Sequence, residues 1–358
     1  MKKMKVGIIG STGMVGQFFI TLLDNHPWFE VALVAASAQS AGKLYSEAVE
    51  GRWLMENDIP PAVAKMKVYD AFNIKEISGQ VDFIFSAISL DDKQAVADLE
   101  TRYAKCEVPV VSNNSAHRWT ADVPMVIPEV NSAHLKVIES QRHRLGTKRG
   151  FITTKPNCSL QSYVPAIYAL RDLTPFKVAV TTYQAVSGAG KTLKSWPEMQ
   201  DNVIPYIGGE EEKSEQEPLK ILGTASHGSI SKASSIIISA QCLRVPVSNG
   251  HMAAVFMSTI KKMEPEEIIA RWRAFNTVPQ QLHLPSAPNP FITYFDEQDR
   301  PQTKLDRDLQ KGMGVAIGRL REDPFFTCKF VALSHNTIRG AAGGAILLAE
   351  LLKAQGYI

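Results

Sequence analysis

The sequence has little of what marks secreted, membrane or nucleic-acid-binding proteins. Its 358 residues include four cysteines, at positions 106, 158, 242 and 328, with no C-x-x-C pair. We therefore expect free thiols rather than a disulfide framework or a metal site. No apolar run has the length of a membrane span, and "MKKMKVGIIG" leads from lysines into a glycine turn rather than a signal peptide. Basic residues are not clustered. These absences predict a cytoplasmic protein with no nucleic-acid or membrane partner.

The composition is that of an ordinary globular protein. The hydrophobic fraction is 45%, the charged fraction is 21% and the formal net charge is +3. A chain of this length is long for one simple core and suits two domains.

The segment "KVGIIGSTGMVGQFFITLLDNHP" begins at Lys5 with a β-branched run, continues through Gly10, Gly13 and Gly16, and then repeats apolar residues at helical spacing. Strand, glycine turn and helix together favour a dinucleotide-binding site, since missing Cβ atoms let backbone N–H groups approach a pyrophosphate. The spacing is G-x-x-G-x-x-G rather than G-x-G-x-x-G, and a tight turn needed only for packing is the alternative. The later runs "VALVAAS", "VDFIFSAIS" and "VPVVSN" predict further parallel strands of a doubly wound sheet.

The second predicted strand ends in "ASAQSAGK", which offers Ser37, Ser40 and Lys43 but no acid. An NAD site usually places Asp or Glu there for the ribose 2′-hydroxyl. The segment therefore favours NADP, and a solvated serine-rich loop is the alternative.

After residue 150 the strand candidates "VAVTTYQAV", "SSIIISAQCLRVPV", "HMAAVFMSTI" and "FFTCKFVALSH" have few helical interruptions. They predict a second, α+β domain with a mainly antiparallel sheet. The helical end of the chain is expected to return to the first domain. The predicted division is 1–155 with 336–358 for the NADP-binding, Rossmann-type α/β domain, and 156–335 for the catalytic domain.

Cys158, in "TTKPNCSLQ", is predicted in the first turn of a helix. The positive end of the helix dipole lowers the pKa of a thiol placed there, which makes Cys158 a candidate nucleophile. The alternative is a small core residue. The motif "SGAGKT" at 187–192 is not a P-loop, because Ala185 stands where that motif needs glycine, although Gly188 and Gly190 leave room for a cofactor.

His251 is the candidate proton-transfer partner of that thiol. It follows an Asn-Gly turn in "CLRVPVSNGHMAAVF", seven residues after Arg244. We expect a hairpin at 248–250 to direct both side chains at one pocket.

Seven segments in order, "GSTGMVG", "SAGK", "VIPEVN", "PNCS", "TYQAVSGAGK", "RVPVSNGH" and "RPQTKLDRD", resemble the aspartate-β-semialdehyde dehydrogenase family. The "SAGK" form and "IGGEEEKSEQEPLKILG" are similar to the branch found in archaea and fungi. The resemblance implies NADPH-dependent reductive dephosphorylation of L-4-aspartyl phosphate to L-aspartate 4-semialdehyde, on the way to lysine, threonine and methionine. It also implies a homodimer or homotetramer built through the second domain.

The resemblance implies a role for each matching residue. Cys158 forms a thioester, His251 relays the proton and Gln184 orients the acyl group. Arg244 binds the α-carboxylate, Glu217 the ammonium and Lys220 the phosphate, with Arg118 and Asn157 completing the phosphate pocket. The implied cofactor contacts are Gly10, Ser11, Thr12, Gly13, Met14, Val15, Gly16, Ser37, Ser40, Lys43, Ser187, Gly188 and Asn336. One departure is Gln39, where the family often has arginine, so the preference for NADP over NAD is expected to be reduced but not reversed.

Three other functions remain open from the sequence. Malonyl-CoA reductase has the same architecture and also forms a cysteinyl thioester, but its substrate has no α-ammonium for Glu217 to bind. N-acetyl-glutamyl-phosphate reductase is a second sibling, and its acylated amine needs no carboxylate partner. A non-catalytic NADP-binding sensor is the third.

Overall fold

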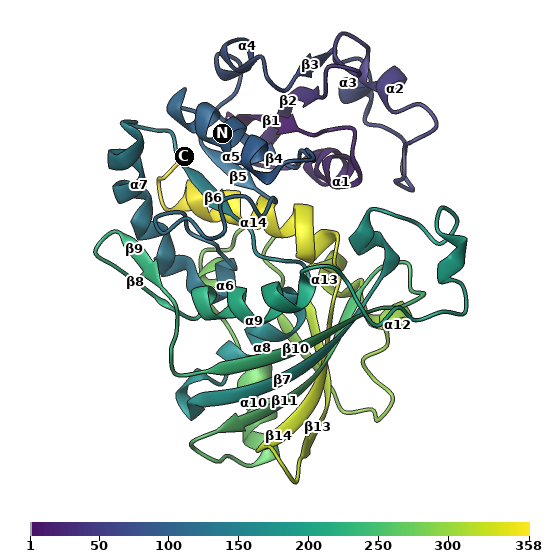
Figure 1. Cartoon of the computed structure of the whole chain (residues 1–358), viewed down its shortest axis with the longest axis vertical. Coiled ribbons are helices and arrows are strands. Elements are labelled where there is room, and N and C mark those ends of the chain that lie inside the picture. Colours follow the sequence, from purple (N-terminus) through teal and green to yellow (C-terminus); the bar gives the residue numbers. More distant parts are fainter. Residues whose placement is uncertain (1) are drawn as a thin grey trace.

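The computed structural model describes residues 2–358, which form two domains around two large sheets (Figure 1). The first sheet is wholly parallel, with the strand order β3-β2-β1-β4-β5-β6. Its strands are β1 Met4–Ile9, β2 Phe29–Ala36, β3 Val68–Asp70, β4 Phe83–Ser86, β5 Val110–Ser112 and β6 Ile152–Thr154. Strands β4 and β5 are buried along their whole length, as expected for a parallel sheet covered on both faces. The predicted Rossmann-type arrangement is confirmed.

Helices of the first half connect these strands. They are α1 Met14–Leu23, α2 Tyr45–Ala48, α3 Pro61–Ala64, α4 Ile74–Ser78, α5 Lys93–Lys105, α6 Pro128–Asn131, η1 Ser132–Val137 and α7 Ile138–Leu145. Helix α1 begins directly after the glycine turn, with Gly13 in an extended conformation at its N-cap. The turn therefore presents the N-terminal end of α1 at the edge where the parallel strands end.

The second sheet has the order β10-β7-β11-β14-β13-β12. Its strands are β7 Pro175–Gln184, β10 Ile237–Arg244, β11 His251–Thr259, β12 Ile292–Phe295, β13 Val315–Glu322 and β14 Cys328–Ser334. The three central pairings are antiparallel, whereas β10 pairs with β7 and β12 pairs with β13 in parallel. The prediction of a mainly antiparallel sheet is confirmed, with a parallel pair at each edge.

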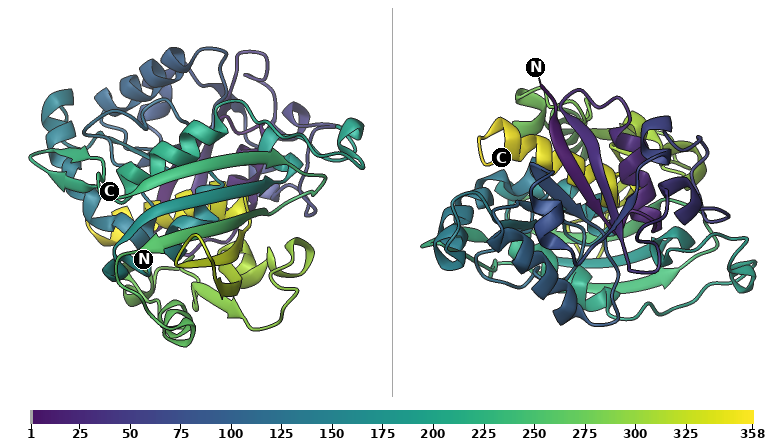
Figure 2. Two further views of the ribbon diagram at one scale, coloured as in Figure 1. Left: turned by 60° about the horizontal axis from the view of Figure 1, so that its bottom comes forward. Right: turned by 90° about the horizontal axis from the view of Figure 1, so that it is seen from above.

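One face of the second sheet is covered by helices. Helix α8 (Leu160–Tyr168) packs on β11 and β14, and α9 (Glu210–Ile221) packs on β10. Burial alternates along β7 and β11, so every second side chain points to the other face. Figure 2 (left) looks onto that other face, so that the strands of the second sheet lie in front of the helices.

Shorter elements complete the second half of the chain. They are η2 Arg171–Leu173, η3 Val186–Ala189, η4 Pro197–Met199, the hairpin β8 Thr224–Ser226 and β9 Ser229–Ser231, α10 Pro265–Arg273, α11 Val278–Gln281, α12 Thr303–Asp306 and α13 Leu309–Gly312. In residues 2–358, no helix has both the length and the apolar character that crossing a membrane requires.

The chain ends in a π-helical turn, η5 (Ile338–Ala342), followed by α14 (Gly343–Ala354). Figure 1 shows α14 between the two sheets. Its apolar residues share one core with Val6 and Ile8 of β1. The domain limits at 155 and 336 stay a prediction.

Candidate active site

Cys158 lies between the end of β6 and the start of α8. The side-chain oxygen of Asn157 accepts hydrogen bonds from the backbone N–H and the hydroxyl of Ser159, at 2.9 and 2.8 Å. These bonds fix the turn that carries the thiol. Cys158 precedes the helix rather than lying in its first turn, and it is the only partly exposed residue in the segment 150–160, whose other side chains are buried.

The expectation of a lowered thiol pKa is wrong. Burial raises the pKa of Cys158 to about 11, and the negative charge of Glu210 acts in the same direction. Lys155, Arg118 and Arg244 oppose this rise. Burial outweighs these three cations, and Cys158 is a thiol rather than a thiolate.

His251 is fully buried at the start of β11. Its Nδ1 accepts a hydrogen bond from the backbone N–H of Ala185 at 3.1 Å. The ring proton is therefore on Nε2, which has no hydrogen-bond partner among residues 2–358. Burial, followed by the charge of Arg244, lowers the pKa of His251 to about 3. The ring is neutral and presents an N–H donor.

The side chains of Arg244 and His251 both approach Gly188, but the two residues are not joined by the expected hairpin. Strand β7 lies between β10, which ends at Arg244, and β11, which begins at His251. The prediction of a direct hairpin between them is therefore wrong. The connecting segment crosses the end of β7, where the backbone carbonyl of Val247 accepts a hydrogen bond from the N–H of Val186. A Cβ atom on Gly188 would lie 2.8 Å from Arg244 Nη1 and 3.0 Å from His251 Nε2. Gly188 thus leaves space between the two side chains.

Glu210, which the sequence analysis did not select, joins the residues around the thiol. Asn157 Nδ2 donates to both of its carboxylate oxygens, and Gln184 Nε2 donates to one at 3.3 Å. Lys213 forms an ion pair with it at 2.7 Å. Burial opposes ionisation of Glu210, but Lys213 and the two amides more than offset it and lower the pKa. The E-x-x-K spacing occurs twice on α9, seven residues apart, and the sequence analysis chose the second pair.

The second pair, Glu217 and Lys220, bonds to residues outside α9. Glu217 forms a buried ion pair with Arg118 at 2.8 Å and accepts from the backbone N–H of Asn157 at 2.7 Å. Lys220 Nζ donates to three backbone carbonyls, those of Arg118, Thr120 and Val123, at 2.7 to 2.9 Å. An ammonium group has three protons, so Lys220 has none left for a phosphate.

The glycine turn has the shape of a pyrophosphate cradle. Gly10 has φ of +86°, and a Cβ there would lie 2.6 Å from the carbonyl carbon of Ala87. A Cβ on Gly16 would lie 2.3 Å from the carbonyl oxygen of Gly10. Glycine at 10 keeps the turn tight, and glycine at 16 lets α1 pack against it. These residues fit a dinucleotide.

The remaining predicted cofactor residues lie in three places. Ser11, Thr12, Met14 and Val15 belong to the turn and the first residues of α1. Ser37 and Lys43 are exposed in the loop after β2, whereas Ser40 is buried. Asn336 Nδ2 donates to Ser187 Oγ at 2.9 Å and Asn336 Oδ1 accepts from the N–H of Gly250 at 2.8 Å, which ties the Gly188 turn to the start of β11. That turn is the short helix η3, not a P-loop.

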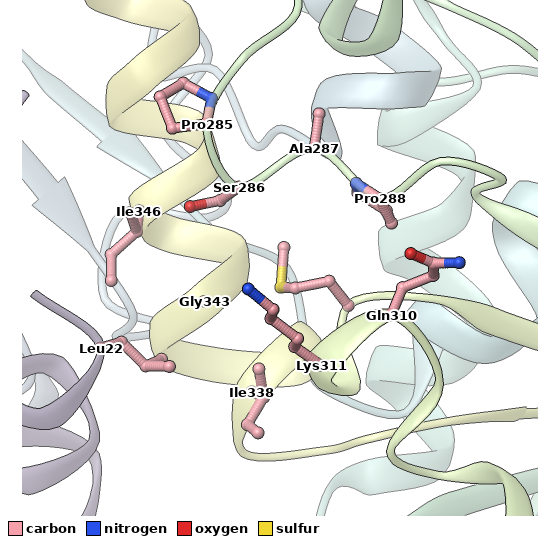
Figure 3. Close-up of a pocket in the computed structure, with 11 residues that line it drawn as sticks. Leu22, Pro285, Ser286, Ala287, Pro288, Gln310, Lys311, Ile338, Gly343 and Ile346 are labelled. Atoms are coloured by element: carbon pink, nitrogen blue, oxygen red, sulfur yellow. The ribbon is translucent and has the colours of Figure 1, made fainter. Parts of the chain in front are cut away.

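A separate cavity of about 360 Å³ lies between α1, α14 and the loop 285–288 (Figure 3). Its lining includes Leu22, Met313 and Ile346, and Lys311 points into it. It contains none of the residues around Cys158 and is not the candidate active site.

Comparison with known proteins decides the family. The description "Semialdehyde dehydrogenase, NAD binding domain" fits residues 5–138, and "Semialdehyde dehydrogenase, dimerisation domain" fits residues 167–339. An aspartate-semialdehyde dehydrogenase from Methanothermobacter thermautotrophicus is 43% identical over 350 residues, which cover 97% of this chain and 98% of that protein. The chain belongs to the aspartate-semialdehyde dehydrogenase family. The archaeal and fungal branch implied by the motifs is confirmed for this member of the family, since the Aspergillus fumigatus aspartate-semialdehyde dehydrogenase is 40% identical over 365 residues, with 99% of each chain covered.

The solved structures agree with the family. The structure of aspartate semialdehyde dehydrogenase with NADP from Candida albicans has a TM-score of 0.89 and 36% sequence identity, with both chains fully covered. The structure of aspartate semialdehyde dehydrogenase II from Vibrio cholerae has a TM-score of 0.74 and 25% identity, over 98% of this chain and 99% of that one. These findings favour an aspartate-semialdehyde dehydrogenase over a malonyl-CoA reductase, an N-acetyl-glutamyl-phosphate reductase or a sensor.

Proposed function

We propose that the chain catalyses the NADPH-dependent reductive dephosphorylation of L-4-aspartyl phosphate to L-aspartate 4-semialdehyde, with release of phosphate. The observation that supports the proposal most strongly is that His251 Nε2 and Arg244 Nη1 both lie next to Gly188. Cys158 belongs to the same domain. A carboxylate-binding fork, a proton donor and a nucleophile are the groups that this reaction requires.

Cys158 is the nucleophile. Its sulfur forms a bond to the acyl carbon while the bond from that carbon to the phosphate oxygen breaks. The thiol proton leaves with the phosphate, and a thioester remains. Bound NADPH supplies the hydride that reduces the acyl group. The Nε2–H of His251 donates to the acyl oxygen as negative charge develops there. Collapse to the aldehyde breaks the carbon–sulfur bond, and His251 takes part in returning the proton to sulfur.

We assign each charged group of the substrate to a residue by comparing the contacts that the candidate residues make in the structure. Arg244 binds the α-carboxylate, because within residues 2–358 its guanidinium has one partner, the carbonyl of Ala185 at 2.7 Å from Nη1. Glu210 binds the ammonium in preference to Glu217, since Glu210 is the acid whose charge acts most strongly on Cys158. Its neighbour Lys213 is the phosphate-binding cation in preference to Lys220. Arg118 and Asn157 stay predictions for the phosphate pocket.

NADP is the proposed cofactor, held by three groups of residues. The turn 10–16 binds the pyrophosphate, the loop 37–43 binds the 2′-phosphate, and Ser187, Gly188 and Asn336 face the reacting end. The support is the Cβ-free cradle at Gly10 and Gly16 and the Candida albicans relative, whose structure contains NADP.

A homodimer is proposed through the open face of the second sheet. Tyr183 pairs with Met252 on one side and Leu243 on the other, and Tyr183 is 37% exposed. These three side chains form an apolar row across three strands in the region that fits the dimerisation-domain description. A tetramer and a cytoplasmic location stay predictions.

The test is reduction of NADP⁺, followed at 340 nm, with L-aspartate 4-semialdehyde and phosphate, beside oxidation of NADPH with malonyl-CoA. Phosphate-dependent activity with the semialdehyde alone supports the proposal. Activity with malonyl-CoA alone overturns the proposed substrate.

A further inference from the structure

Lys155 is a buried lysine that the proposed chemistry does not use. It follows β6, and its backbone N–H donates to the carbonyl of Ser112 at 2.8 Å. Its side chain is 2% exposed, and Nζ donates to the carbonyl of Gly340. Its stem lies so close to α14 that a Cβ on Gly344 would be 2.6 Å from Cε. The sequence places small residues where this side chain needs room.

Lys155 differs from Arg118 and Arg339, two buried arginines near it, because each of those has a carboxylate partner. Arg118 pairs with Glu217 at 2.8 Å, and Arg339 donates to Glu129 at 2.7 Å. No carboxylate in residues 2–358 lies within ion-pair distance of Lys155 Nζ. Burial of an ammonium group without an anion is costly. The position therefore calls for an anion that the resting structure does not provide.

Cys158 supplies the group that can become this anion. A Cβ on Gly340 would lie 2.8 Å from Cys158 Cβ and 3.3 Å from its Cα. Gly340, in the π-helical turn η5, thus touches Cys158 on one side and accepts the Lys155 hydrogen bond through its carbonyl. One residue separates the buried cation from the nucleophile.

We propose that Lys155 is a positioning residue that stabilises the anionic form of the Cys158 sulfur by its charge and holds the Gly340 turn against it. The inference rests on the proposed function, because it requires Cys158 to be the nucleophile. Five charged groups face this pair: Glu210, Glu217, Arg118, Arg244 and Arg339. Glu217 and Glu129 neutralise two of the arginines, and the substrate carboxylate neutralises Arg244. Lys155 is the cation that remains for the sulfur.

The electrostatic balance of the site supports this assignment. Burial and Glu210 raise the pKa of Cys158, and Lys155 is the strongest of the three cations that oppose them. Burial also lowers the pKa of Lys155 well below its usual range, whereas Cys158 raises it. Each group favours the charged form of the other.

The test is the rate of alkylation of Cys158 by iodoacetamide in the full-length protein, measured by mass spectrometry of its peptide at several pH values from 7 to 9. Cys106, which is exposed, is the internal control in the same sample. Lys155→Met removes the charge at nearly constant volume, and Lys155→Arg keeps it. We expect alkylation of Cys158 to slow about tenfold in Lys155→Met, equivalent to one pKa unit, and to stay within about threefold of wild type in Lys155→Arg.

Enzyme kinetics provides the second readout. In Lys155→Met, we expect kcat to fall about tenfold with KM within about twofold, and Lys155→Arg to restore kcat. If Lys155→Met alkylates Cys158 at the wild-type rate, or if arginine fails to restore either rate, the proposal is overturned. Failure of the proposed function is a different result, in which replacement of Cys158 itself leaves turnover unchanged.

A measurement on the unsubstituted chain covers the case in which Lys155→Met does not fold. The Cε resonance of Lys155, in protein labelled with ¹³C-lysine, is titrated before and after Cys158 is alkylated with iodoacetate, which places a carboxylate on its sulfur. We expect the pKa of Lys155 to rise after alkylation, because a neighbouring anion favours the charged lysine. An unchanged titration overturns the proposal.

Discussion

Asn157 Nδ2 donates to both carboxylate oxygens of Glu210, at 3.0 and 2.9 Å, although 53 positions separate the two residues. The bond joins the residue before the nucleophile to the first turn of α9. It places a carboxylate beside the thiol, where the substrate ammonium is proposed to bind.

Glu210→Gln is therefore expected to weaken substrate binding. Loss of a charge-assisted contact costs about 1.5 to 3 kcal/mol, so we expect KM for L-aspartate 4-semialdehyde to rise by at least about tenfold. Glu217→Gln is the matched comparison on the same helix face, and it is expected to lower the melting temperature more than it raises KM, because it leaves Arg118 buried without its partner. The reverse pattern would return the ammonium site to Glu217.

His251→Asn is expected to lower kcat by about 10² or more with little change in KM, which is the scale of a lost proton-transfer group. The reason is the Nε2–H, which no residue in the described part of the chain accepts. His134→Asn is the control, since His134 is also buried but bonds to Gly223 outside the site. Equal effects of the two substitutions on kcat would contradict the role of His251.

Acid is expected to destabilise the fold through buried histidines, most strongly through His251 and His335. Burial lowers the pKa of His251 to about 3 and that of His335 to about 4, from 6.5. Between pH 6.5 and these values the unfolded chain binds more protons, so the free energy of unfolding rises with pH across that window and levels off above it.

Urea unfolding at several pH values measures this slope. We expect His251→Asn to flatten the dependence of the unfolding free energy on pH, because one of the proton-binding groups is lost. An unchanged slope between pH 4 and 6.5 would show that His251 does not titrate as described.

Lys43→Ala is expected to raise KM for NADP about tenfold while leaving KM for NAD within about twofold. Lys43 is exposed in the loop after β2, and it is the cation assigned to the 2′-phosphate. Gln39, also exposed, stands where a second cation fits, so Gln39→Arg should increase the ratio of kcat/KM for NADP over NAD. A wild-type preference for NAD would refute this assignment.

Tyr183→Asp is expected to convert a dimer to monomers, because it places a charge in the apolar row with Leu243 and Met252. Light scattering after size exclusion measures the mass. Lys75→Asp changes an exposed residue of α4 in the first domain, away from this face, and is the control. Activity should fall with dissociation, since Gln184 and His251 are the chain neighbours of Tyr183 and Met252. A monomeric wild type would contradict the proposed face.

The sequence predicts most of this site, because its main signals are local. Three glycines at the junction of a strand and a helix specify the cradle, and "PNCS" and "NGH" place Cys158 and His251 at the ends of elements. The features that the sequence does not predict depend on contacts between residues far apart in the chain. The passage of β7 between Arg244 and His251 depends on strand order, and the choice between Glu210 and Glu217 depends on the buried ion pair that joins Glu217 to the distant Arg118. The raised pKa of the thiol depends on burial, which no short motif encodes.

The most direct test of the central claim is a burst experiment without phosphate. Enzyme, NADP⁺ and L-aspartate 4-semialdehyde are mixed, and NADPH is followed at 340 nm while the protein mass is measured. We predict about one equivalent of NADPH per active site, an aspartyl group bound to Cys158, and steady turnover only when phosphate is added. Burst or turnover that persists in Cys158→Ala would contradict the account.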